Sequence, residues 1–71
     1  MYRIALEFHK TLDPQTQDLY THMASVELFM QHAIHCEQTS ESTLEFYSER
    51  DRAFAVLVLG KFPQFTCRLV D

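Results

Sequence analysis

The spacing of apolar residues changes at Asp13-Pro14, and this change constrains the fold more than any other feature of the sequence. Before it, every second side chain from Tyr2 onward is large and apolar as far as Phe8, the pattern of a half-buried strand. Asp13 can accept a hydrogen bond from a free helix N–H, and Pro14 needs no donor at the next position. We therefore predict a strand over residues 2–9 and a helix that begins at Pro14.

The predicted helix carries one apolar stripe. Its members recur at steps of four, three, four and three residues: Leu19, Met23, Val26, Met30 and Ala33. This spacing keeps the five side chains on one face, as in a helix with one buried side. We expect the helix to run from Pro14 to about His32.

Two short β-type runs follow over residues 33–38 and 43–48, and the polar tract 39–42 between them suits a hairpin connection. Four of their side chains are expected to face the core: Ile34, Cys36, Leu44 and Phe46. Residues 65–70 form a final predicted strand. Its side chains on one side are Phe65, Cys67 and Leu69.

Residues 53–59 are apolar without interruption, so their periodicity fits either a buried helix or a buried strand. Ser48 and Asp51 resemble a capping box in which Asp replaces Glu or Gln. Gly60 and Pro63 supply a helix stop on the other side. These end signals favour a second helix, and the strand interpretation stays open.

The predicted order is β-α-β-β-α-β, the split pattern of ferredoxin-like domains. We predict one compact α+β domain over residues 1–71, with a four-stranded antiparallel sheet and two helices on one face. Its first and third strands are central, so Cys36 and Cys67 lie on opposite edges. Strands are about 4.8 Å apart, which puts these edges roughly 14 Å from each other, beyond the reach of a disulfide. Both thiols are therefore expected to be reduced and to pack as small core residues.

The formal net charge is −4, from ten acidic and six basic residues. This balance opposes binding to nucleic acids and to anionic membranes. No apolar run approaches the roughly 18 to 20 residues that span a bilayer, and the first residues lack a signal-peptide core. We expect a cytoplasmic protein with neither nucleic acid nor membrane as a partner. Arg50, Arg52 and Lys61 form one local basic patch, which keeps nucleic-acid binding as a third hypothesis.

The sheet face without helices is expected to be mixed in charge. Its predicted residues are Arg3, Ala5, Glu7, His9, His35, Glu37, Thr43, Glu45, Tyr47, Thr66, Arg68 and Val70. RNA-binding sheets of this topology place stacking aromatic residues amid basic residues on the central strands. The central strands here offer Glu7, Glu45 and a single aromatic residue, Tyr47, so we expect a face covered by solvent or by a partner protein.

The second helix can bury only one stripe against a sheet. We assign to that stripe Ala53, Phe54 and Leu57. This assignment leaves outside Ala55, Val58 and Leu59. An exposed apolar strip fits a homodimer interface. The alternative is that the first helix and the turn 62–65 cover it, and both interpretations stay open.

His32, His35 and Cys36 are the only metal-ligand residue types close together in the sequence. A structural zinc site needs four ligands in defined positions. The candidates for the fourth ligand do not converge with them on the predicted strands: Cys67, Glu37 and His9. We predict no metal and no cofactor.

The sequence contains no phosphate-binding glycine run, nucleophile elbow or paired-histidine helix motif. We therefore predict that the protein is not an enzyme. The alternative is a small dimeric enzyme or effector-binding domain that uses His9, Glu45 and Tyr47 on the open sheet face.

Residues 43–57 resemble a pattern found in small accessory proteins of tailed bacteriophages: an acidic-aromatic strand, a charged turn and an apolar helix. The resemblance implies a protein made in an infected bacterium that binds and redirects a host protein. It implies no functional residues.

These observations together predict a non-enzymatic protein–protein interaction module that forms a homodimer. The expected self-association surface consists of Ala55, Val58 and Leu59. The expected surface for a partner protein consists of Glu7, Glu37, Glu45 and Tyr47.

Overall fold

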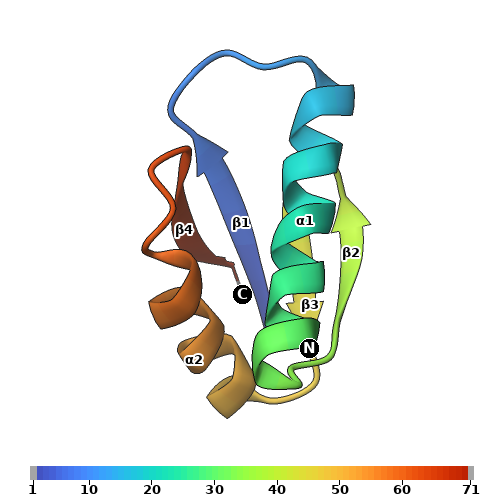
Figure 1. Ribbon diagram of the computed structural model, residues 1–71, viewed down its shortest axis with the longest axis vertical. Helices are drawn as coiled ribbons and strands as arrows, with labels where there is room; N and C mark the ends of the chain where they lie inside the picture. The colour runs from blue at the N-terminus through green and yellow to red at the C-terminus, as the bar shows by residue number, and fades with distance from the viewer. Residues whose placement is uncertain (1, 71) are drawn as a thin grey trace.

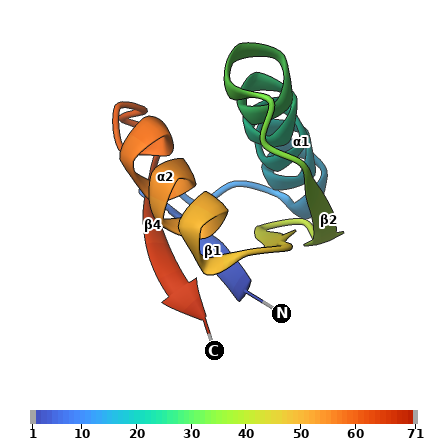
Figure 2. The same cartoon turned by 90° about the horizontal axis from the view of Figure 1, so that it is seen from below.

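The computed structural model describes residues 2–70 as a single sheet covered by two helices. The elements follow in the order β1 (Tyr2–Phe8), α1 (Pro14–His32), β2 (Cys36–Ser40), β3 (Thr43–Phe46), α2 (Glu49–Leu59) and β4 (Phe65–Val70). The sheet is antiparallel with strand order β2-β3-β1-β4. Both helices lie on one of its faces (Figures 1 and 2). The predicted α+β fold and its ferredoxin-like order are confirmed.

The first helix begins and ends through local hydrogen bonds. The Asp13 carboxylate accepts the Thr16 backbone N–H at 2.7 Å, as its position before Pro14 predicts. At the other end, Ala33 adopts the left-handed conformation with φ 56°, and its N–H bonds to the Phe29 carbonyl at 3.0 Å. The prediction that residue 33 begins a strand is wrong, because this reversal turns the chain out of the helix and delays β2 until Cys36.

The apolar segment 53–59 is helical. The Ser48 hydroxyl accepts the Asp51 N–H at 3.0 Å, so the predicted cap forms, and the helix ends at Leu59 just before Gly60. The strand interpretation of this segment is therefore excluded.

The core lies between the sheet and the two helices. Its buried residues are Ile4, Leu6, Thr21, Ala24, Leu28, Ile34, Leu44, Phe46, Ala55, Leu59 and Phe65. Thr21 is fully buried with its hydroxyl donating to the Glu41 carbonyl at 2.6 Å, which ties α1 to the β2–β3 turn. Hydrogen bonding removes the cost of burying that hydroxyl.

The predicted burial of the apolar stripe of α1 is wrong. The face of α1 that packs against the sheet carries Thr21, Ala24 and Leu28. The predicted stripe faces outward. Residues three and four apart share a helix face, so Thr21, Ala24 and Leu28 form a row of their own. Two of these side chains are small, which lets the helix lie close to the sheet.

The predicted sides of α2 are reversed. Ala55 and Leu59 are fully buried, and Val58 is half-buried against the core. The three residues assigned to the core stripe are exposed instead: Ala53, Phe54 and Leu57. The prediction that Ala55, Val58 and Leu59 form an exposed self-association strip is therefore wrong. Phe62 of the following turn packs against the same core, as the alternative interpretation expected.

The buried face of α2 could not be recognised from the sequence because it includes a cationic residue, Arg52. Arg52 lies three residues before Ala55 on the core-facing row and is almost fully buried. Its guanidinium stands over the ring of Tyr2, 5.4 Å from the centroid, and donates to the Arg3 carbonyl at 3.5 Å. A charged side chain in a buried row breaks the apolar pattern from which burial is predicted.

Cys36 and Cys67 lie on opposite edge strands, as predicted, and both are free. Both are half-buried and pack against the core. Burial raises the pKa of each thiol from 9.0 to about 11. Both thiols are therefore protonated and weakly reactive at neutral pH.

Candidate functional site

The outer face of α1 carries four large apolar side chains that are exposed to solvent. We call it the α1 ridge and define it by Leu19, Met23, Val26 and Met30, whose exposed fractions are 55%, 55%, 44% and 70%. Their steps of four, three and four residues match the repeat that aligns one side of a helix with a partner helix in a coiled coil. The four side chains therefore form one continuous apolar row along the exposed side of α1.

Acidic groups border the ridge. α1 contains Asp18 and Glu27 and neither Lys nor Arg. Asp18 accepts a hydrogen bond from the Gln38 amide at 2.7 Å, and Glu27 is bound by Lys61 at 2.8 Å. The surroundings of the ridge on its own helix are thus negative or neutral.

The second helix adds apolar surface beside the ridge. Leu57 is 78% exposed, and Phe54 is exposed with its ring 5.3 Å from the His32 ring in an edge-to-face contact. The two helices meet at this contact, and Glu27 of α1 is ion-paired with Lys61 of the turn that follows α2. Both helices therefore present large apolar side chains to solvent on the side away from the sheet.

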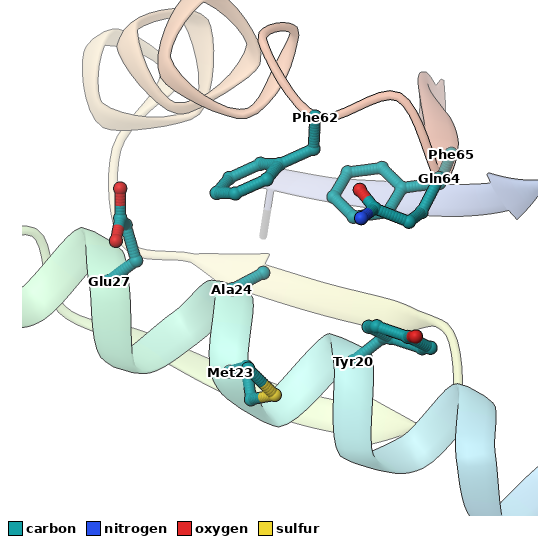
Figure 3. Close-up of a pocket in the computed structure, with 7 residues that line it drawn as sticks. All are labelled: Tyr20, Met23, Ala24, Glu27, Phe62, Gln64 and Phe65. Carbon is teal, nitrogen blue, oxygen red and sulfur yellow. The ribbon is translucent and has the colours of Figure 1, made fainter.

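A small pocket opens beside the ridge, between α1 and the turn that follows α2 (Figure 3). It is lined by Tyr20, Met23, Ala24, Glu27, Phe62, Gln64 and Phe65 and measures about 140 Å³. Figure 3 shows Phe62 and Phe65 on one side and the α1 side chains on the other. Ligand sites usually measure about 300 to 1,000 Å³, so this pocket suits one inserted side chain.

A second cavity of about 300 Å³ adjoins the first through Tyr20 and Gln64. Its other lining residues are His9, Lys10, Leu12 and Pro63. The His9 Nδ1–H donates to the Pro63 carbonyl at 2.9 Å, and Nε2 lies 2.6 Å from the Thr66 hydroxyl. Both ring nitrogens of His9 therefore fasten the end of β1 to the start of β4.

The predicted acidic partner surface is divided. On the open sheet face, Glu7 pairs with Arg68 at 2.8 Å and Glu45 pairs with Arg3 at 3.3 Å. Glu37 lies opposite Glu45 in the strand register. A hydrogen bond to Glu37, together with the negative charge of that carboxylate, raises the pKa of the exposed Tyr47 hydroxyl. The structure brings Glu37, Glu45 and Tyr47 together and places Glu7 elsewhere on the face.

The residues of the alternative enzyme hypothesis do not converge. Glu45 lies opposite Arg3, and His9 follows Arg3 by six residues along the same extended segment. At about 3.3 Å per residue, His9 is roughly 20 Å from Glu45. A shared proton-transfer site would require these groups within hydrogen-bond reach.

The predicted metal and nucleic-acid residues are also separated. The rings of His32 and His35 pack against Phe54 and Phe29, respectively. Within residues 2–70, no three His, Cys, Asp or Glu side chains are arranged to hold a metal ion. Arg52 is buried near the start of α2, whereas Lys61 is ion-paired beyond its end, so the predicted basic patch is not formed.

A comparison with protein-family models, curated proteins and solved structures finds no match for this chain. None of the helices in the described part of the chain has the length and apolar character needed to cross a bilayer.

Proposed function

We propose that this chain is a non-enzymatic protein–protein interaction module that binds a basic amphipathic helix of a partner protein along the α1 ridge. One observation carries the proposal: four large apolar side chains are aligned on the solvent face of a helix whose opposite face already fills the core. Exposed apolar patches of this kind are characteristic of interaction sites.

The composition of the ridge favours a helical partner. The coiled-coil spacing aligns the four side chains along the helix axis, so a second helix can contact all of them. Met23 and Met30 have flexible side chains that adapt to different partner surfaces. Covering four half-exposed apolar side chains contributes about 4 kcal/mol before the entropy cost of association, so we expect modest affinity from the ridge alone.

The charge around the ridge favours a basic partner. Asp18 borders it and is hydrogen-bonded to the neutral Gln38 amide, whereas Glu27 is already ion-paired with Lys61. The whole chain carries a net charge of −4. Lys or Arg side chains beside the apolar stripe of the partner helix would be attracted at this surface. Their contribution decreases with added salt, because surface charges are screened.

The resemblance of residues 43–57 to accessory proteins of tailed bacteriophages points to the setting. In that setting, the partner is a cytoplasmic protein of the infected bacterium, which the module binds and redirects. The proposal retains self-association of the module, although not through Ala55, Val58 and Leu59, which lie in the core or against it.

The test uses a labelled synthetic helix with Leu at coiled-coil positions and Lys beside them, and it measures binding by fluorescence anisotropy. Met30→Glu places a charge on the ridge, and Gln15→Glu places the same charge on the first turn of α1. We expect Met30→Glu to weaken binding about tenfold or more and Gln15→Glu to leave it unchanged. The added negative charge alone favours a basic peptide, so a loss reports the apolar contact.

A second peptide with Glu in place of Lys controls for charge. It should bind about tenfold more weakly than the basic peptide at low salt. The proposal is wrong if the basic peptide does not bind at about 1 mM, or if Met30→Glu and Gln15→Glu bind it equally.

A further inference from the structure

The backbone of β4 presents an unpaired row of hydrogen-bonding groups. The His9 N–H donates to the Gln64 carbonyl at 3.0 Å and continues the β1–β4 register, in which Glu7 lies opposite Thr66. In an antiparallel pair, alternate residues exchange both backbone bonds. Thr66 and the residues two and four further on therefore bond to β1.

The hydrogen bonding between β1 and β3 confirms which residues of β1 bond to which neighbour. The Leu6 N–H donates to the Ser42 carbonyl at 2.7 Å, so the even-numbered residues of β1 bond to β3 and the odd-numbered ones to β4. It follows that three residues of β4 direct their N–H and C=O groups away from the sheet: Phe65, Cys67 and Leu69.

The opposite edge of the sheet is protected. The register of β2 shifts between Gln38 and Ser40, and the Gln38 side-chain amide donates to the Ser40 carbonyl at 3.0 Å. Glu37 also lies opposite Glu45. Irregular pairing and charge are the usual means by which an edge strand avoids another chain. β4 pairs with β1 over six residues with no such shift.

We infer that β4 pairs with β4 of a second copy of this chain, antiparallel and with Cys67 opposite Cys67. In this register Phe65 of each copy lies opposite Leu69 of the other. All three outward residues then form hydrogen-bonded pairs, two bonds to a pair. The strand is self-complementary in this register, as a two-fold interface requires.

Neighbouring registers fit less well. Outward residues must pair with outward residues, so the register can move only by two positions. One such shift places Arg68 opposite Arg68, where like charges repel. The other places Thr66 opposite Thr66. Both leave one outward residue of β4 without a partner in the other strand. The register centred on Cys67 places Arg68 opposite Thr66, and Arg68 keeps its ion pair with Glu7.

The exposure of Leu69 supports the pairing. Leu69 lies on the same side of β4 as Phe65 and Cys67, which face the core, yet it is 55% exposed. In the dimer, Leu69 lies beside Phe65 of the second copy, and these apolar side chains form a cross-strand pair.

The pairing rests on the self-association included in the proposed function, but it uses a different surface. α1 lies over the β2 side of the sheet, and β4 is the opposite edge (Figure 2). The ridge and the β4 edge can therefore be occupied together, and either can fail without the other.

Sedimentation equilibrium over a range of protein concentrations tests the dimer. We expect the unmodified chain to reach twice its monomer mass, Leu69→Lys to remain monomeric, and Leu57→Lys, the matched exposed leucine on α2, to dimerise normally. A monomer at every concentration overturns the inference, as does a Leu69→Lys variant that still dimerises.

The two cysteines supply a second measurement without any substitution. Both are half-buried with a pKa of about 11, and each lies on one edge of the sheet. Dimerisation through β4 slows alkylation of Cys67 relative to Cys36 as protein concentration rises. Equal slowing, or slowing of Cys36 alone, contradicts the pairing.

Leu69→Lys should bind the basic peptide as the unmodified chain does, so a failure of the ridge proposal is recognised separately.

Discussion

The buried face of α1 carries smaller side chains than its exposed face. The core face consists of Thr21, Ala24 and Leu28, whereas the outer face carries the four larger apolar residues of the ridge. The core face fits because small side chains allow close approach to the sheet and because the Thr21 hydroxyl has a backbone acceptor. Apolar size therefore does not decide which face is buried; fit and hydrogen bonding do.

The largest expected difference between the faces is in stability. Leu28 is fully buried, so Leu28→Ala should lower the free energy of unfolding by about 3 kcal/mol through lost burial and a residual cavity. Met30→Ala on the ridge should change it by less than about 0.5 kcal/mol. Urea unfolding of both variants measures the contrast, and equal losses would mean that the outer face is also packed in the folded chain.

Removing the polar group of the core face should have a smaller effect. Thr21→Val keeps the shape and leaves the Glu41 carbonyl without its donor, so we expect a loss of about 1 kcal/mol. Thr11→Val, at an exposed position before the helix, is the matched control and should be neutral within about 0.5 kcal/mol. A Thr21→Val variant as stable as the parent would show that this hydrogen bond does not select the buried face.

A substitution at the C-terminal end of α1 should increase stability. Ala33 holds a left-handed conformation that favours glycine. Ala33→Gly should therefore raise the free energy of unfolding by about 0.5 to 1 kcal/mol. Thermal unfolding measures this gain. A loss of stability would contradict the helix end at Ala33 and return residue 33 to an extended strand.

The start of α1 gives the smallest effect, visible as a dependence on pH. Hydrogen bonds from Thr16, through its side chain and its backbone N–H, lower the pKa of the Asp13 carboxyl below its ordinary 3.8. The cap therefore stabilises the folded chain above that value and loses its contribution as the pH falls through the lowered pKa. Asp13→Asn keeps an acceptor that does not titrate, so it should remove this part of the acid dependence. An unchanged acid profile would contradict it.

Most of the fold was predictable because its signals are local. Asp13-Pro14 and Ser48 fix the helix starts through hydrogen bonds that involve residues close in sequence. The alternation from Tyr2 onward defines β1, and β4 begins and ends as predicted. With both helices and all four strands placed, few topologies remain open to a chain of this size.

The functional surfaces were not predictable in the same way, because burial depends on packing between distant segments. Arg52 is buried by Tyr2 and the Arg3 carbonyl, which are far away in the sequence. Leu19 and Met30 are large and apolar, and they face outward because Thr21, Ala24 and Leu28 occupy the side of α1 that packs on the sheet. One signal was present: the ridge repeats every 3.5 residues, as helix-pairing seams do.

We propose that the outer face of α1 binds a partner while the inner face remains in the core. The most direct test is a titration with the basic peptide, followed through the methyl resonances of Met23, Val26 and Met30 and of buried Leu28 and Leu44. We expect large chemical-shift changes in the three ridge residues and small ones in the two core leucines. Changes confined to the open sheet face or the core, or no changes at saturating peptide, would contradict it.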